Sequence, residues 1–174
     1  WDKGVGEFVE AARRLKARGI RARFALVGDR DVENPAAVPQ ANIEAWRTEG
    51  VVELWGWRND MAQVYRESHI VCLPSYREGV PRSLLEAMSM GLPCIATDIR
   101  GAREIIKHGE EGLLFQPKDV PALARLIDRL YRDSELRMRI ARNARALAIA
   151  QYDEAGYLQK QVSAIERFLP RAQA

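Results

Sequence analysis

Cysteine and histidine are both scarce in this chain, with two of each among 174 residues. Cys72 and Cys94 each lie in a short apolar segment, which indicates buried thiols in a reducing compartment such as the cytoplasm. His69 and His108 stand alone, without the spacing of metal ligands, and we expect both to be structural. The scarcity of these residues argues against a disulfide scaffold and against a Cys/His metal site.

Long apolar runs are also missing, because no segment reaches the roughly 18 residues that span a bilayer. No internal repeat or low-complexity segment is visible, and 47% hydrophobic with 29% charged residues is typical of one globular domain. The net charge of +3 is small, and we expect no nucleic-acid partner. The arginines of the last third follow helical stretches, which indicates either a solvated helix surface or a face directed at phosphate or anionic lipid: Arg125, Arg129, Arg132, Arg137, Arg139, Arg142 and Arg145.

Short apolar strands alternate with helices along the chain. The pattern predicts strands at 23–28, 51–54, 70–73, 94–97 and 113–115. It predicts helices at 5–17, 41–48, 60–67, 82–90, 102–107, 119–131, 134–150 and 153–168, with caps at Asn59 or Asp60 and at Asp119, and a stop at Gly91. Such alternation is typical of an α/β fold with a doubly wound, Rossmann-like parallel sheet, whose ligands bind at the carboxyl ends of the strands.

The segment from Glu78 to Glu86 is the most informative part of the chain. It places two carboxylates eight positions apart, the first in a loop and the second on a helix that begins after Pro81. The positive end of that helix and its free amides suit an anion such as phosphate. Carboxylates beside it suit hydroxyl groups, and a sugar nucleotide offers both phosphate and hydroxyls.

Several motifs occur together in the order that one enzyme family uses. They are Lys3-Gly4 before a helix, Val27-Gly28-Asp29, Gly56 before a helix, Pro74-Ser75-Tyr76-Arg77-Glu78-Gly79, Glu86-Ala87-Met88, Gly91-Leu92-Pro93, Gly101-Ala102-Arg103-Glu104 and Gly109-Glu110-Glu111-Gly112. The chain resembles the C-terminal, donor-binding domain of retaining glycosyltransferases of family 4, which have the GT-B architecture. The resemblance implies that residues 1–174 form one domain of a two-domain enzyme. It also implies that a terminal helix at 153–169 returns to the N-terminal acceptor domain.

The same resemblance assigns roles to individual positions. Glu78 contacts hydroxyls of the transferred sugar near the reacting centre, and Glu86 binds the ribose hydroxyls. Lys3 neutralises the diphosphate, and the backbone amides of Arg82 and Ser83 hold a phosphate. The other implied donor-binding positions are Gly28, Gly79, Val80 and Pro81, together with Trp57 and Arg58 where the backbone reads the base.

The implied reaction is transfer of a hexose or N-acetylhexosamine from a nucleotide-diphosphate sugar, UDP foremost, to a glycan or lipid-linked acceptor. Polysaccharide or O-antigen assembly at the cytoplasmic face of the membrane is the implied setting, with peripheral membrane association of the full-length protein. We expect no cofactor and no metal, because Lys3 and the helix end do the work of a cation, and we expect this chain alone to bind donor without transferring sugar. Two alternatives stay open: a sugar-nucleotide epimerase or phosphorylase of the same architecture, and a non-catalytic binding domain.

Overall fold

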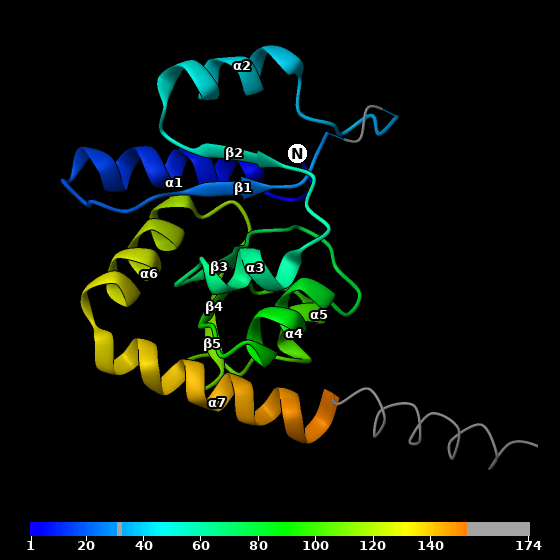
Figure 1. Cartoon of the computed structure of the whole chain (residues 1–174), viewed down its shortest axis with the longest axis vertical. Helices are drawn as coiled ribbons and strands as arrows, with labels where there is room; N and C mark the ends of the chain where they lie inside the picture. The colour runs from blue at the N-terminus through cyan, green and yellow to red at the C-terminus, as the bar shows by residue number, and fades with distance from the viewer. Residues whose placement is uncertain (31–32, 153–174) are drawn as a thin grey trace, which may run out of the picture.

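The computed structural model of the chain describes residues 1–30 and 33–152 (Figure 1). The strands are β1 (Ala25–Val27), β2 (Glu53–Gly56), β3 (Val71–Leu73), β4 (Cys94–Thr97) and β5 (Gly112–Phe115). The helices are α1 (Val5–Ala17), α2 (Gln40–Glu49), α3 (Met61–Arg66), α4 (Arg82–Ser89), α5 (Arg100–Arg103), α6 (Val120–Arg132) and α7 (Ser134–Tyr152). The helix expected at 153–169 lies outside the described residues.

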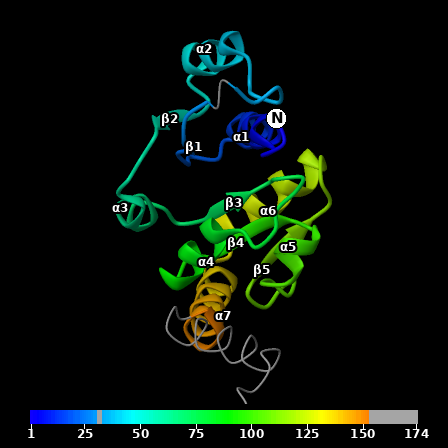
Figure 2. The same cartoon turned by 90° about the vertical axis from the view of Figure 1, so that its right-hand side faces the viewer.

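All strand pairs in the described residues are parallel, which confirms the α/β, Rossmann-like prediction. The hydrogen-bonded ladders form two groups, β1–β2 and β3–β4–β5, rather than one continuous sheet. Figure 2 shows the first group lying beside α1 and α2, above the second. Side-chain packing joins the two groups, because one core contains Phe24 and Val52 from the first side and Ile95 and Leu113 from the second.

Helices cover both faces of the β3–β4–β5 group. Ile95 of β4 faces the core that contains residues of α1 and α6, whereas Cys94 and Ala96 face a second core with residues of α4 and α7. Accordingly α1 packs on α6, and α4 packs on α7. A strand buried on both faces has no solvent-facing polar side, which explains why the first three residues of β4, Cys94 to Ala96, are all apolar.

The helix ends predicted at Asp60, Gly91 and Asp119 are confirmed in position, whereas the bounds of the helix predicted at 102–107 are wrong. Asp119 caps α6 by accepting a hydrogen bond from the Ala122 amide at 2.8 Å, and Gly91 ends α4 with a φ of +73°. Asp60 occupies the N-cap position of α3 but makes no capping bond, because Arg58 holds its carboxylate at 2.6 Å. The helix predicted at 102–107 is instead the short α5, after which Ile105 and Ile106 enter the core from a turn.

A close backbone contact fixes the turn before α1 against the loop that follows β3. Gly4 has a φ of +66°, and a Cβ placed on it would lie 2.1 Å from the Pro74 carbonyl oxygen, so only glycine fits there. The amide of Tyr76 then donates to the carbonyl of Asp2 at 2.8 Å. These contacts bring residues 1–4 to the carboxyl end of β3, where the predicted site residues gather.

Candidate functional site

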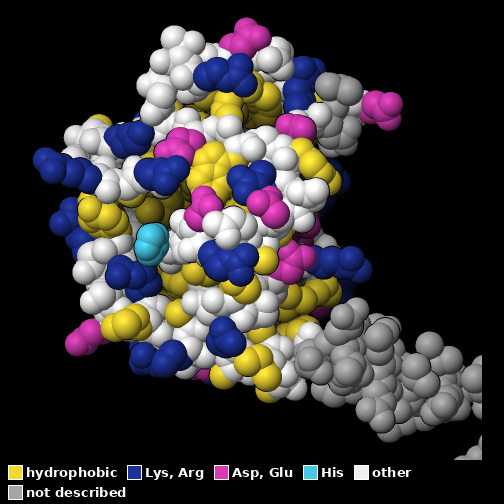
Figure 3. All heavy atoms as spheres, viewed as in Figure 1, with side chains coloured by type: hydrophobic (Ala, Val, Ile, Leu, Met, Phe, Trp, Pro, Cys, Tyr) yellow, Lys and Arg dark blue, Asp and Glu magenta, His cyan; other side chains and the backbone are white. Residues whose placement is uncertain are grey.

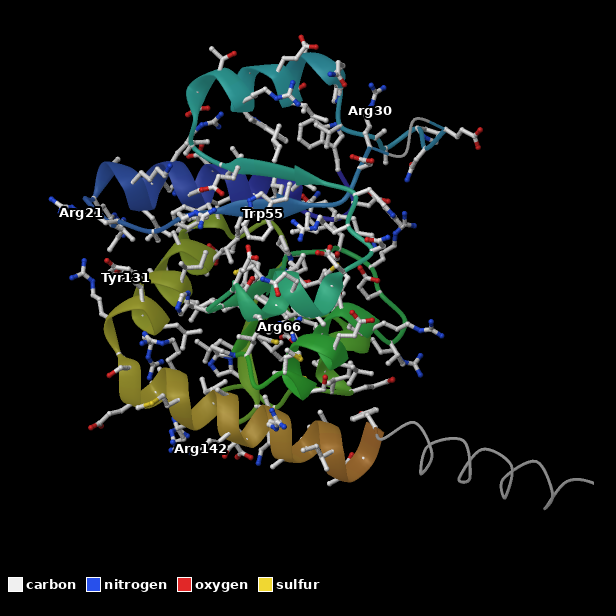
Figure 4. The ribbon with its side chains drawn as sticks, in the orientation of Figure 1. Arg21, Arg30, Trp55, Arg66, Tyr131 and Arg142 are labelled. Carbon is white, nitrogen blue, oxygen red and sulfur yellow. The ribbon has the colours of Figure 1, made fainter. Side chains whose placement is uncertain are left out.

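The loops that follow β1 and β2 lie side by side at the carboxyl ends of these strands. The Gly28 amide donates to the Gly56 carbonyl at 2.8 Å, so the turn at Gly28 touches the start of the segment predicted to read the base. In that segment Trp57 is 75% exposed, and the Arg58 guanidinium is paired with Asp60. Trp55, labelled on β2 in Figure 4, is half-buried and donates its indole N–H to Glu53 at 2.9 Å.

Lys3 and Glu78 meet directly, which the sequence did not predict. The Lys3 Nζ lies 2.7 Å from the Glu78 Oε1, and the Glu78 side chain is only 16% exposed. The bond is charge-assisted, because an ammonium donates to a carboxylate. It joins two predicted site residues that lie 75 positions apart in the sequence.

Further contacts hold the loop that carries Glu78. The Tyr76 hydroxyl donates to Glu7, and burial together with this carboxylate raises the pKa of Tyr76 to about 12. Arg77 forms an ion pair with Asp2. On its other side the loop packs closely against α5, because a Cβ placed on Gly101 would lie only 1.8 Å from the Gly79 carbonyl oxygen. The backbone at Glu78 and Gly79 is therefore held between the turn before α1 and the start of α5.

The N-terminus of α4 presents free amide groups, as the sequence predicted. Pro81 occupies the N-cap position and makes no side-chain cap, and its carbonyl accepts the amides of Leu84 and Leu85. Within the described part of the chain the amides of Arg82 and Ser83 have no acceptor, and both residues are exposed. Two N–H groups at the positive end of a helix form a potential anion site.

Glu86 lies one turn further along α4 and is exposed. Its Oε2 accepts a hydrogen bond from the Tyr65 hydroxyl at 2.9 Å. Tyr65 itself is only 4% exposed, and burial followed by the Glu86 carboxylate raises its pKa well above the usual range. The side chain of Glu86 is therefore anchored by a group that remains protonated.

A cleft opens beside Glu78. It is lined by Tyr76, Arg77, Glu78, Gly79, Asp98, Ile99, Arg100 and Arg103. The structure thus brings Glu78 and Gly79 together in one cleft, whereas the other predicted site residues are outside its lining: Lys3, Gly28, Trp57, Arg58, Val80, Pro81, Arg82, Ser83 and Glu86. The sequence analysis gave Asp98 no role, although its position directly after β4, at the carboxyl end of a strand, is the signal that could have identified it.

No metal cluster is found in the described residues, in the sense of three or more His, Cys, Asp or Glu side chains that could hold an ion. The sequence does contain one Asp-x-Asp spacing, at Asp29 and Asp31, and Asp31 lies outside the described residues. Metal independence therefore stays a prediction. None of the helices among residues 1–30 and 33–152 combines the length and apolar character of a membrane span.

Residues 1–133 match the family described as glycosyl transferases group 1. The chain belongs to this family. A relative of this glycosyltransferase chain, the N,N'-diacetylbacillosaminyl-diphospho-undecaprenol alpha-1,3-N-acetylgalactosaminyltransferase of Campylobacter jejuni, is 37% identical over 169 residues. That alignment covers 97% of this chain and 43% of the relative, so the chain spans less than half the length of this curated relative.

Solved glycosyltransferase structures share the fold. HepE of Anabaena in complex with UDP is 27% identical and superposes with a TM-score of 0.83, covering 97% of this chain and 46% of that one. The C-terminal domain of the group 1 glycosyltransferase LpcC of Francisella tularensis is 28% identical with a TM-score of 0.71, covering 88% of this chain and 81% of that one. The resemblance seen in the sequence is thus confirmed for the group 1 glycosyltransferase family and for the fold, whereas membership of family 4 and retention of configuration stay predictions.

Proposed function

We propose that this chain is the C-terminal, donor-binding domain of a retaining family 4 glycosyltransferase. The whole protein would transfer a hexose or N-acetylhexosamine from a nucleotide-diphosphate sugar, UDP foremost, to a glycan or lipid-linked acceptor in polysaccharide biosynthesis. The observation that carries the proposal is the 2.7 Å contact between Lys3 and Glu78, which places a cation against a carboxylate at the carboxyl end of β3. The UDP bound in HepE and the undecaprenol-linked acceptor in the name of the Campylobacter relative support the choice of ligands.

Each part of the donor has a group suited to its chemistry. The diphosphate is anionic and would accept hydrogen bonds from the Lys3 ammonium and from the free amides of Arg82 and Ser83. The ribose hydroxyls would donate hydrogen bonds to the exposed Glu86 carboxylate. The base would lie along Trp57 and its neighbours, and the hexose would enter the cleft at Glu78 and Gly79.

The reaction needs the leaving diphosphate to be neutralised and the positive charge at the anomeric carbon to be stabilised. Lys3 and the N-terminus of α4 supply the first need, because preorganised donors act without reorganisation as charge develops. Loss of one such donor typically costs about 3 kcal/mol in the transition state. Glu78 would supply the second need by placing negative charge beside the sugar, and the leaving phosphate would help to deprotonate the acceptor with retention of configuration.

No metal is required in this scheme, since Lys3 and the helix end neutralise the diphosphate. Nucleotide affinity should therefore be the same with and without a chelator of divalent cations. The chain alone should bind donor without transferring sugar, because the proposed acceptor domain is contributed by another part of the protein. Addition of that part should be necessary for turnover.

The proposal includes peripheral association with an anionic membrane surface at the cytoplasmic face. The outer stripe of α7 consists of Met138, Arg142, Arg145 and Ile149, which recur at helical spacing, and Met138 and Ile149 are 52% and 59% exposed. No Asp or Glu occurs between 136 and 152. Basic and hydrophobic side chains lie next to one another along α7, at the lower edge of Figure 3. Arginines interleaved with exposed apolar groups on one helix face suit a membrane interface.

Calorimetric titration of the chain with UDP, GDP and ADP tests the donor assignment. We expect UDP to bind, and Glu86→Ala to weaken its binding about tenfold through loss of a charge-assisted contact. Glu135→Ala, another exposed helical glutamate at the start of α7, is the matched control and should leave affinity unchanged. Absence of binding by all three nucleotides at millimolar concentration would contradict the proposal.

A further inference from the structure

Tyr65 of α3 connects two of the proposed donor-binding groups. Its hydroxyl lies 2.9 Å from the Glu86 Oε2 and 3.2 Å from the Ser83 carbonyl oxygen, and its ring is buried with Leu84 and Met88 of α4. We propose that Tyr65 is a positioning residue for the nucleotide pentose, which fixes the Glu86 carboxylate in the orientation that accepts the ribose hydroxyls. This inference rests on the proposed function and extends it to a residue that the sequence did not single out.

The hydroxyl has one proton and two acceptors within reach. The bond to Glu86 is shorter and is charge-assisted, so the Tyr65 hydroxyl donates its hydrogen bond to the carboxylate rather than to the neutral Ser83 carbonyl. Burial, and then the Glu86 carboxylate, raise the pKa of Tyr65 well above the usual range, so the hydroxyl is a hydrogen-bond donor at neutral pH. Tyr65 can therefore hold Glu86 without itself titrating.

This bond gives an exposed side chain a defined orientation. Within the described residues Glu86 has no side-chain partner other than Tyr65, and a free glutamate on a helix surface samples many rotamers. The bond occupies Oε2 and leaves Oε1, with the remaining lone pairs, for a vicinal pair of hydroxyls. A carboxylate that is already oriented loses less conformational entropy when it binds.

The location of α3 strengthens the assignment. The helix begins at Met61, directly after the Trp57–Asp60 segment that would meet the base, and Figure 1 shows it beside α4. One short helix thus joins the segment proposed for the base to the carboxylate proposed for the ribose. If Tyr65 only filled the core, its ring would be needed there but its hydroxyl would not.

Tyr65→Phe separates these two roles, because it keeps the buried ring and removes only the hydroxyl. Titrations should compare UDP with 2',3'-dideoxy-UDP for the parent, Tyr65→Phe, Glu86→Ala and the double variant. We expect Tyr65→Phe to weaken UDP about tenfold and the dideoxy analogue less than twofold. In the Glu86→Ala background, Tyr65→Phe should have no further effect on either ligand.

Tyr131→Phe is the matched control, because it removes the hydroxyl of an exposed tyrosine on α6 that belongs neither to the cleft nor to the proposed nucleotide site. It should leave the ratio of UDP to dideoxy-UDP affinity unchanged, and near-ultraviolet circular dichroism should show both variants folded. Equal weakening of the two ligands by Tyr65→Phe, or additive losses in the double variant, would overturn the inference. Failure of the parent to bind UDP, or unchanged UDP binding by Glu86→Ala, would instead overturn the proposed function.

Discussion

Lys3 and Glu78 form an ion pair at 2.7 Å although one precedes α1 and the other follows β3. The pair is possible because Gly4 lets the backbone before α1 approach the Pro74 carbonyl closely. Under the proposed function the Lys3 ammonium has a second role, as a partner of the donor diphosphate. Glu78 and the diphosphate therefore compete for the same cation.

This competition predicts opposite effects of Glu78→Gln on binding and on catalysis. Removal of the charge frees Lys3, so UDP should bind at least as tightly as in the parent. The gain should be no more than about fivefold, since Lys3 is mostly exposed and such ion pairs are weak. Sugar transfer by the whole protein should fall about 100-fold, because the carboxylate no longer stabilises the charge at the reacting centre. Calorimetry measures the first effect and steady-state kinetics the second.

The matched control is Glu110→Gln, which removes the carboxylate from a second lysine–glutamate pair, with Lys107 at 2.6 Å. This variant should bind UDP as the parent does. Weaker UDP binding by Glu78→Gln would mean that Glu78 and the diphosphate do not compete for Lys3. Full transfer activity of the variant would mean that Glu78 takes no part in the reaction.

The close contact of Gly101 with the loop that carries Glu78 should make the protein sensitive to a larger residue at position 101. In Gly101→Ala the new methyl group would lie 1.8 Å from the Gly79 carbonyl oxygen and 2.5 Å from that of Glu78, so α5 and the loop must separate. We expect a loss of about 3 kcal/mol in the free energy of unfolding, and a fall in Tm of roughly 9 °C, measured by calorimetry. Gly79→Ala, where a Cβ meets no atom within 4 Å, should change stability little; equal losses in both variants would show that the contact is not the cause.

The order of elements could be predicted from the sequence because local patterns encode it. β4 is buried on both faces and its first three residues are all apolar, and Asp119 followed by Pro121 predicts the start of α6. A helix was predicted near α5 but its bounds were not, since the contact of Gly101 with Gly79 involves a neighbour distant in the sequence. The division of the strands into two ladders likewise depends on how the layers pack.

The candidate site was predictable in kind but not in detail. Glu78, Glu86 and Lys3 could be proposed as site residues because they lie in motifs made of adjacent residues, and their roles stay predictions. The contact between Lys3 and Glu78 spans 75 positions, and no local pattern announces it. Tyr65 was missed for a related reason, because a tyrosine on an amphipathic helix predicts core packing and only the fold shows which acceptor its hydroxyl meets.

The interactions of Glu53 should contribute to the loss of stability of the protein in acid. The guanidinium of Arg23, and then the indole of Trp55, lower the pKa of Glu53 from 4.5 to about 2. Because the folded-state pKa is depressed, the stabilisation is complete above pH 4.5 and is lost as the pH falls toward 2. Glu53→Gln should flatten the fall of Tm across this window and change little at pH 7 beyond the loss of one exposed pair. An unchanged slope between pH 4.5 and 2 would exclude this contribution.

The outer stripe of α7 predicts binding to anionic membranes. Each arginine near a negatively charged surface contributes about 1 kcal/mol, so the charge reversal Arg142→Glu with Arg145→Glu should lower the affinity for vesicles about 30-fold or more. The measurement is flotation with vesicles of phosphatidylcholine alone and of phosphatidylcholine with an equal amount of phosphatidylglycerol. The parent should float with the anionic vesicles, and less at high salt because screening weakens the attraction.

A charge-matched control separates this surface from the overall charge of the chain. Arg21→Glu with Arg47→Glu makes the same change in net charge at exposed positions near α1 and α2, away from α7 in Figure 1. If α7 is the contact surface, the control variant keeps its affinity for anionic vesicles and only the α7 variant loses it. Equal losses in the two variants would mean that net charge alone drives the attraction, and flotation of the parent with neutral and anionic vesicles alike would mean that the arginines take no part in it.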